Sequence, residues 1–159
     1  MLINVCWRYA ANKEQAVEYM NLGFVKILLN LKQYKLHVPF DLWAKRVMIN
    51  CIFNEFKKNK TWTEKTVDIK EATLANVGSD SETSAEQDEL IDLIKTKVLQ
   101  LPPMTAKVFN LYAIDGYMHN EISSLLGISE GTSAWHYSEA KKRIRQMIGV
   151  NTMNANNGK

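Results

Sequence analysis

The chain has 159 residues, enough for one ordinary domain or two small ones. Its hydrophobic fraction of 46% and charged fraction of 23% are typical of a globular protein and exclude a disordered or membrane-embedded chain. Glycine and proline are scarce, with 7 and 3 residues, and no segment alternates polar and apolar residues as a strand would. The composition therefore predicts an all-α fold.

The net charge of +3 is unevenly distributed along the sequence. Residues 1–75 include 12 basic and 7 acidic residues, residues 76–100 include 2 and 6, and residues 101–159 include 6 and 4. Two basic segments separated by an acidic one suggest two modules that bind a polyanion and a spacer that does not. Ordinary solvated surfaces show similar charge patterns, so the charge distribution alone does not identify a protein that binds a polyanion.

The sequence predicts neither a metal site nor a catalytic centre. Cys6 and Cys51 lack the neighbouring cysteines or histidines of a zinc site, so we expect two reduced thiols. No nucleophile–base pairing or glycine-rich phosphate loop stands out, which argues against an enzyme, a cofactor or a small-molecule substrate. The N-terminus does not resemble a signal peptide, and the apolar run 24–29 is far shorter than the ~20 residues of a membrane span. We therefore expect a cytoplasmic protein.

Three helices are expected in the N-terminal half, over residues 4–8, 13–30 and 40–58. Pro39 favours a new helix after the irregular stretch 32–39. Apolar residues at spacings of three and four predict one buried face on the second helix. Its members are Val17, Met20, Phe24, Ile27, Leu28 and Leu31. The apolar face expected to pack against it, on the third helix, comprises Trp43, Val47, Cys51, Ile52, Phe53 and Phe56.

The helical periodicity fades near residue 59 and returns at Leu90. Between these points, residues 76–89 are small, polar and acidic, which is the composition of a flexible linker. Further helices are expected over 90–101, 105–114, 119–126 and 130–148. The predicted organisation is a helical domain at 1–62, a linker at 63–88, a second helical domain at 89–149 and a disordered tail at 150–159.

Residues 119–132 have the pattern of a helix-turn-helix. A short amphipathic helix would end at Gly127, and Ser129 is suited to cap the next helix. In such a motif the second helix presents its first residues to the major groove, and basic residues further along meet phosphates. The alternative is an ordinary helical hairpin followed by a basic run. The candidate DNA contacts are Thr132, Ser133, Trp135, His136, Glu139, Lys141, Lys142, Arg143 and Arg145. For Trp135, a place in the core or against a partner is an equal alternative.

The C-terminal half resembles region 4 of bacterial sigma factors of the extracytoplasmic-function class. Leu101-Pro102-Pro103 is similar to the "LPP" that precedes a helix in that family. The stretch 116–132 is similar to the family's helix-turn-helix, and 131–140 looks most like members from Bacteroidetes.

The N-terminal half resembles region 2 of the same family. Residues 12–24 are similar to a stretch that usually reads "A-x-D-x-x-Q-[DE]-x-F", and residues 40–50 to "F-x-x-W-x-x-x-I-x-x-N". The chain departs from the family in lacking a segment usually found before Leu2, which suggests a shortened variant or a misplaced start. It also departs at the surface that docks on polymerase in the family, where an acidic character is weakened by Glu18, Asn21 and Leu22.

The resemblance implies two helical domains, a region 2-like bundle and a region 4-like helix-turn-helix, that direct core RNA polymerase to promoters. Region 2 would recognise and melt the −10 element, and region 4 would bind the −35 element through the residues named above. The loop 33–38 would capture a flipped base, with Tyr34 and Trp62 able to stack on it, whereas Trp43 is expected in the core. The implied −10 contacts are Arg46, Asn50, Asn54, Lys57 and Lys58.

The implied partners are promoter DNA, core RNA polymerase through its β′ clamp helices and β flap, and an anti-sigma factor. Two alternatives remain. A helix-turn-helix regulator would use residues 1–75 for sensing or dimerisation. A degenerate sigma factor would occupy polymerase or an anti-sigma factor without initiating transcription.

Overall fold

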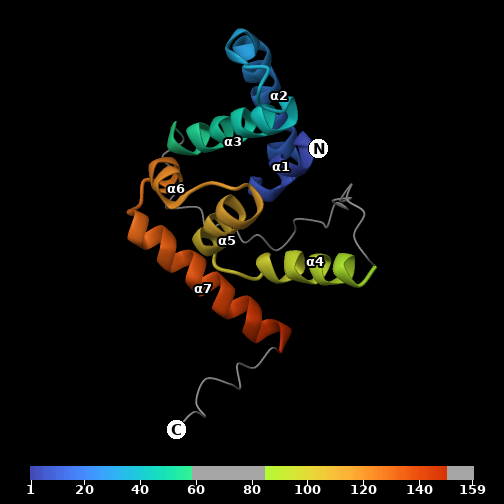
Figure 1. The fold of residues 1–159 in the computed structure, drawn as a ribbon, viewed down its shortest axis with the longest axis vertical. Coiled ribbons are helices and arrows are strands. Elements are labelled where there is room, and N and C mark those ends of the chain that lie inside the picture. The colour runs from blue at the N-terminus through green and yellow to red at the C-terminus, as the bar shows by residue number, and fades with distance from the viewer. Residues whose placement is uncertain (59–84, 150–159) are drawn as a thin grey trace. The chain divides into compact units, whose positions relative to one another are not determined.

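The computed structural model describes residues 1–58 and 85–149 (Figure 1). The chain divides into two compact units, Met1–Asp80 and Ser81–Lys159. Every regular element within the described ranges is helical, which confirms the predicted all-α fold. Most of the predicted linker and the whole of the predicted tail lie outside the described residues. No helix in the described part of the chain is long and apolar enough to cross a membrane.

The first unit contains α1 (Leu2–Tyr9), α2 (Lys13–Asn30), the 3₁₀ turn η1 (Leu31–Gln33) and α3 (Phe40–Lys58). The bounds of α2 and α3 are those predicted, while α1 begins two residues before the predicted start. At the start of α2, the Oδ1 of Asn12 accepts a hydrogen bond of 2.9 Å from the backbone N–H of Gln15. The Oε1 of Gln15 in turn accepts one of 2.6 Å from the N–H of Ala11. These two bonds fix the first turn of α2.

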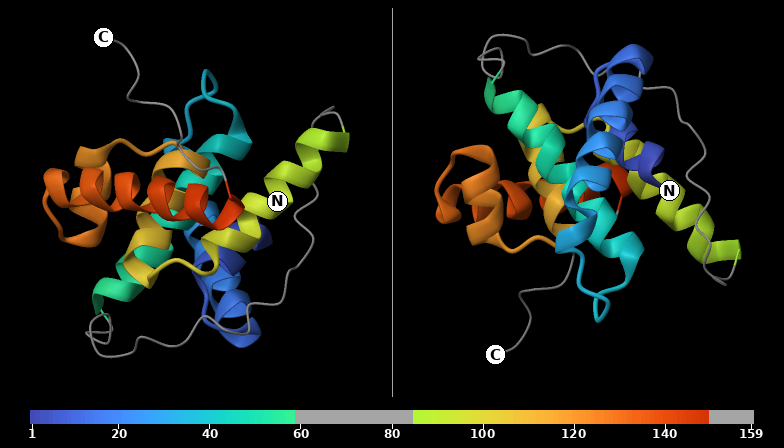
Figure 2. Two further views of the ribbon diagram at one scale, coloured as in Figure 1. Left: turned by 90° about the horizontal axis from the view of Figure 1, so that it is seen from below. Right: turned by 90° about the horizontal axis from the view of Figure 1, so that it is seen from above.

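The three helices of the first unit pack against one another around a single core. Helix α2 crosses α3 steeply (Figure 2). The buried face of α2 consists of Ala16, Tyr19, Gly23 and Ile27. Gly23 faces the buried side chain of Met48, and a Cβ added at Gly23 would overlap the Sδ of Met48. The absence of a side chain at Gly23 therefore makes room for Met48.

The predicted apolar face of α2 was largely wrong. Of its members, Ile27 is buried, but the side chains of Val17, Phe24, Leu28 and Leu31 are between 43% and 50% exposed. On α3 the fully buried residues are Ala44, Met48, Ile49, Ile52 and Phe53, so Ile52 and Phe53 are confirmed. The other predicted residues of that face, Trp43, Val47, Cys51 and Phe56, are only half-buried. The buried face of α2 therefore combines two small residues, Ala16 and Gly23, with Tyr19 and Ile27.

The second unit contains α4 (Ala85–Val98), α5 (Pro103–Phe109), the π-helical turn η2 (Asn110–Ile114), α6 (His119–Leu126) and α7 (Glu130–Ile148). Helices α6 and α7 have the predicted bounds. Helix α4 begins five residues before the predicted start, and the single helix predicted at 105–114 is α5 followed by η2. Pro103 occupies the first turn of α5, where its missing N–H costs nothing.

Helix α7 packs against α4, α5 and α6, and it crosses α5 (Figure 2). One part of the core joins Val98, Leu101 and Ala106 to Ala140 and Ile144 of α7. The partly buried side chains around that cluster are Ile94, Phe109, Met147 and Ile148. Ala140 and Ile144 are both buried. The second unit thus has a core of its own, against which α7 is held.

Candidate nucleic-acid interface

The turn between α6 and α7 has the geometry of a helix-turn-helix. Helix α6 ends at Gly127, whose φ of +67° is accessible to glycine at little cost. The carbonyl of Ser123 accepts hydrogen bonds from the N–H groups of Gly127, at 2.9 Å, and Ile128, at 3.2 Å. The Oγ of Ser129 accepts one of 3.0 Å from the N–H of Thr132, which confirms Ser129 as the cap of α7. Local sequence therefore fixes both ends of the turn.

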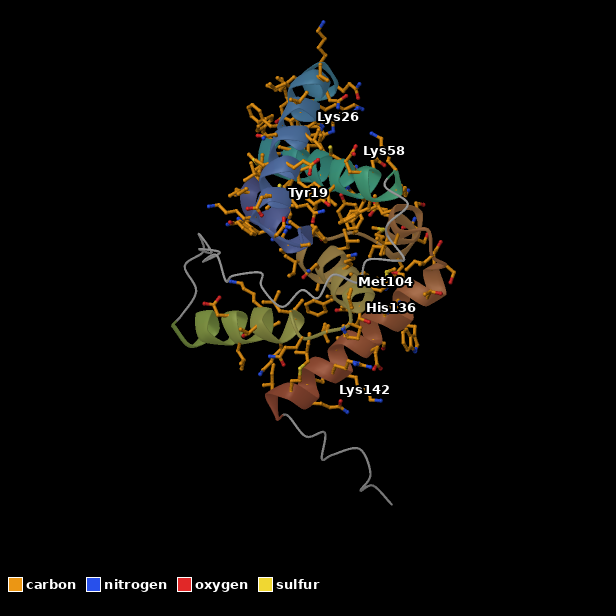
Figure 3. All side chains as sticks on the ribbon, turned by 180° about the vertical axis from the view of Figure 1, so that it is seen from behind. Tyr19, Lys26, Lys58, Met104, His136 and Lys142 are labelled. Atoms are coloured by element: carbon orange, nitrogen blue, oxygen red, sulfur yellow. The ribbon has the colours of Figure 1, made fainter. Side chains whose placement is uncertain are left out.

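Helix α7 presents a solvent-exposed face along its length. Thr132 and Trp135 lie near its start, and the Trp135 side chain is 59% exposed. Lys142 lies about two turns further on and points away from the helix into solvent (Figure 3). Ser138 and Arg145 are exposed between and beyond these residues, and Ser138 was not among the predicted contacts. This face combines an indole, hydroxyls and cationic groups, which can bind both base edges and phosphates.

Two predicted contacts on α7 face inward. Ser133 is 0% exposed, and its Oγ lies 2.9 Å from the Nδ1 of His119. Ser133 therefore lies off the exposed face of α7, and its buried side chain does not support the predicted DNA contact. His136 is half-buried, with its Nδ1 3.0 Å from the Oγ1 of Thr105 on α5. Burial lowers the pKa of the His136 imidazole below its ordinary value of 6.5.

Three further predicted contacts on α7 already have intramolecular partners. The Nε of Arg143 donates a hydrogen bond of 2.7 Å to the Oε1 of Glu139. This hydrogen bond lowers the pKa of the Glu139 carboxyl. The Nζ of Lys141 lies 4.6 Å from the centre of the Tyr137 ring. These contacts orient Glu139, Lys141 and Arg143 without burying their charged ends.

A second polar surface lies on α3. All five of its predicted contacts are exposed, at spacings that place them on one side of the helix, namely Arg46, Asn50, Asn54, Lys57 and Lys58. The Nζ of Lys58 donates to the Oε1 of Glu55 at 2.7 Å, and this bond raises the pKa of Lys58. Amide and cationic groups on one face suit base edges and phosphates respectively.

The loop before α3 is held by an aromatic cluster. The Tyr34 ring centre lies 5.3 Å from that of Phe40 and 5.2 Å from that of Trp43. Its hydroxyl donates a hydrogen bond of 2.7 Å to the carbonyl of Val38. Tyr34 is therefore engaged within the loop, while Trp62 lies outside the described residues. Sequence reasoning overlooked Leu36, whose side chain is 91% exposed within this loop.

The predicted polymerase-facing residues Glu18, Asn21 and Leu22 are all exposed on α2. Sequence reasoning overlooked the apolar side chains exposed on the same helix, and predicted some of them to be buried. The exposed apolar residues of α2 are Val17, Leu22, Phe24, Val25, Leu28 and Leu29. We refer to these six residues as the apolar surface of α2.

The described residues contain no group of three or more His, Cys, Asp or Glu side chains that could hold a metal ion. Cys6 is buried, and burial raises the pKa of its thiol to about 11. Burial also raises the pKa of Cys51. Neither thiol is activated as a nucleophile or a metal ligand would be.

Comparison with known proteins shows similarity to sigma factors. Residues 91–144 match the family model of sigma-70, region 4. The chain is 22% identical over 156 residues to the ECF RNA polymerase sigma factor SigW of Bacillus subtilis (strain 168). The alignment covers 92% of this chain and 82% of that protein. Its fold resembles that of the sigma factor RpoE from Bartonella quintana, solved in complex with the anti-sigma factor NepR. The TM-score is 0.57 at 13% identity, and the match covers 94% of this chain and 91% of RpoE.

Proposed function

We propose that the chain is a sigma factor of the extracytoplasmic-function class and that it directs core RNA polymerase to promoters through two separate DNA-binding surfaces. The α7 face would bind the −35 element as a duplex. The α3 face would recognise and melt the −10 element. The protein would act in the cytoplasm and without catalytic chemistry of its own.

The observation that carries this proposal is the helix-turn-helix of α6 and α7. Its turn is fixed by Gly127 and Ser129, and it falls within the stretch that matches sigma-70 region 4. Trp135 and Lys142 are exposed on the second helix, where such motifs meet the major groove and the flanking phosphates. We retain Thr132, Trp135, Lys142 and Arg143 as contacts and remove Ser133, because its side chain is buried.

The role of α3 follows from its exposed amides and lysines. The amide groups of Asn50 and Asn54 can pair with base edges that become exposed when the duplex opens. Lys57 and Lys58 lie one turn further along and can bind the phosphates of the separated strand. Leu36 lies in the preceding loop, where an apolar side chain can insert between bases.

Polymerase would contact the apolar surface of α2 and the neighbouring Glu18 and Asn21. Apolar side chains that no other described helix covers are typical of an interaction surface. The β′ clamp helices are the proposed partner of α2, and the β flap that of the second unit. By analogy with RpoE, which was solved with NepR, an anti-sigma factor is the proposed negative regulator.

The proposal is tested by transcription of fragmented genomic DNA with purified core polymerase, with and without this protein. We expect new transcripts whose start sites share two upstream motifs at constant spacing. A regulator of the helix-turn-helix class would neither bind core polymerase nor produce such transcripts. A degenerate sigma factor would bind core polymerase tightly and still yield none, which would overturn the proposal.

A further inference from the structure

His119, the first residue of α6, contacts both of the elements that flank it in the second unit. Its Nδ1 lies 2.9 Å from the Oγ of Ser133 on α7. Its ring stacks on Tyr112 of η2, with ring centres 4.4 Å apart and an angle of 15° between the planes. None of the DNA contacts proposed above includes His119, so these interactions need another explanation.

Both rings also contact Tyr137 of α7. The ring centre of Tyr137 lies 4.4 Å from that of Tyr112, with the planes tilted by 41°, and 6.2 Å from that of His119. The π-helical turn η2 carries Tyr112 into this stack. A π-helical turn interrupts the regular hydrogen bonds of an α-helix, and such turns are frequent at functional sites. The rings of His119, Tyr112 and Tyr137 thus connect α6, η2 and α7.

The hydrogen bond to Ser133 joins His119 to the first turn of α7. Ser133 is fully buried, so its hydroxyl loses free energy if no partner accepts or donates a hydrogen bond. It lies in the first turn of α7, next to Thr132 and two residues before Trp135. Any rotation or tilt of α7 that broke the bond to His119 would also change the direction in which Thr132 and Trp135 point.

We infer that His119 is a positioning residue for promoter recognition: through Ser133 and Tyr112 it sets the angle at which α7 meets the −35 duplex. This inference rests on the proposed function and adds a residue that does not itself touch DNA. Its effect should appear in the discrimination between base pairs, because base contacts depend on orientation more strongly than phosphate contacts do.

The test uses the full chain with core polymerase and compares binding to an intact promoter with binding to promoters changed at single −35 base pairs. His119→Phe keeps a ring for Tyr112 but removes Nδ1. Ser133→Ala removes the buried hydroxyl. We expect each variant to reduce the preference for the intact −35 element by about tenfold. The double variant should lose no more of that preference than either single variant, because both substitutions remove the same hydrogen bond.

The salt dependence of binding separates positioning from direct contact. If His119 acts only on orientation, the slope of log affinity against log salt stays unchanged in His119→Phe. A slope that falls by about one would show a phosphate contact by His119 and overturn the inference. Leu99→Ala, at a side chain of the second unit that is 39% exposed and lies on neither proposed DNA-binding face, should leave −35 discrimination unchanged.

Two further outcomes would overturn the inference. Additive losses in the double variant would show that His119 and Ser133 act independently, and an unchanged preference in His119→Phe would show that orientation does not depend on the ring.

The ¹⁵N resonance of His119 Nδ1 in the full chain should shift in Ser133→Ala. If the unaltered protein shows no −35 preference at all, the proposed function fails as well, whereas a preference insensitive to these variants removes the inference alone.

Discussion

Gly23 shows how a single residue determines the packing of the first unit. A Cβ at this position would overlap the Sδ of the buried Met48 and lie 2.6 Å from its Cε. Gly23→Ala should therefore lower the free energy of unfolding by about 1–3 kcal/mol, because Met48 has to leave its rotamer and displace its neighbours. Denaturant unfolding followed by circular dichroism measures the change.

The matched control is Gly131→Ala on α7. There the nearest atom beyond the adjacent residues and the helix backbone is the Oγ of Ser129, 3.8 Å from the added Cβ. With no clash, alanine should leave the stability unchanged or raise it by up to ~1 kcal/mol. Equal effects of the two substitutions would show that helix propensity alone, and not the fit of Met48, decides the outcome at Gly23.

His136 gives the stability of the second unit a predictable dependence on pH. Because burial lowers the pKa of its imidazole below 6.5, the unfolded chain binds a proton there more readily than the folded chain. Its contribution therefore rises with pH between the folded pKa and 6.5 and is complete above 6.5. Stability is lost as the pH falls below about 6.5 towards the folded pKa.

His136→Gln should accordingly flatten the decrease in unfolding free energy between about pH 7 and pH 5, relative to the unaltered chain. Urea unfolding at a series of pH values measures this slope. His37→Gln, at an exposed histidine in the first unit, should retain the original slope. A His136→Gln variant that is as steep as its parent would contradict the burial argument.

At the scale of the elements, the bounds of most helices could be predicted from the sequence, but the buried face of α2 could not. The bounds of α6 and α7 could be predicted because local features, a glycine at one end and a capping serine at the next, determine them. The buried face of α2 could not, because it depends on how closely α3 approaches. Gly23 lies against Met48 of α3 and Ala16 is also buried, whereas Phe24 and Leu28, which are larger, remain exposed.

The functional site shows the same division between local and tertiary determinants. The exposed positions on α3 follow from helix periodicity, and all five predicted residues are exposed. Ser133 and His136 were predicted to face DNA, but they bond to His119 and Thr105 on other helices. These partners are 14 and 31 residues away in sequence, so the pattern of α7 alone could not identify them.

The apolar surface of α2 can be tested as a polymerase-binding element. Leu22→Ala should weaken binding to core polymerase by about tenfold, because it removes apolar contact area that the folded first unit does not itself bury. Leu22 and Leu99 are each 39% exposed, so Leu99→Ala in the second unit is a matched control. A fluorescence titration with labelled protein measures both affinities. Equal affinities for the two variants would exclude Leu22 from the interface.

At the scale of the whole molecule, the two units have separate cores and separate polar surfaces. The core of the first unit includes Ile52 and Phe53, and the core of the second unit includes Ala140 and Ile144. Residues 76–100, which carry 2 basic and 6 acidic residues, include the boundary between the two units at residues 80 and 81. Two weak DNA-binding surfaces on one polypeptide gain affinity from high effective concentration once polymerase holds both near a promoter.

This arrangement predicts that residues 1–80 and 81–159 fold when they are produced separately. Each fragment should show helical circular dichroism and a cooperative thermal transition, because each retains its own buried cluster. If either fragment remains unfolded alone while the full chain is folded, the two units depend on each other and the division of labour proposed here is incorrect.

The division of labour is tested most directly by comparing a duplex promoter with the same promoter pre-melted over the −10 region. Lys57→Ala combined with Lys58→Ala should reduce open-complex formation by core polymerase on the duplex, and the pre-melted template should restore it, since opening has already occurred. Trp135→Ala combined with Lys142→Ala should reduce promoter binding on both templates. If pre-melting restored the activity of both double variants, or of neither, the result would contradict separate roles for α3 and α7.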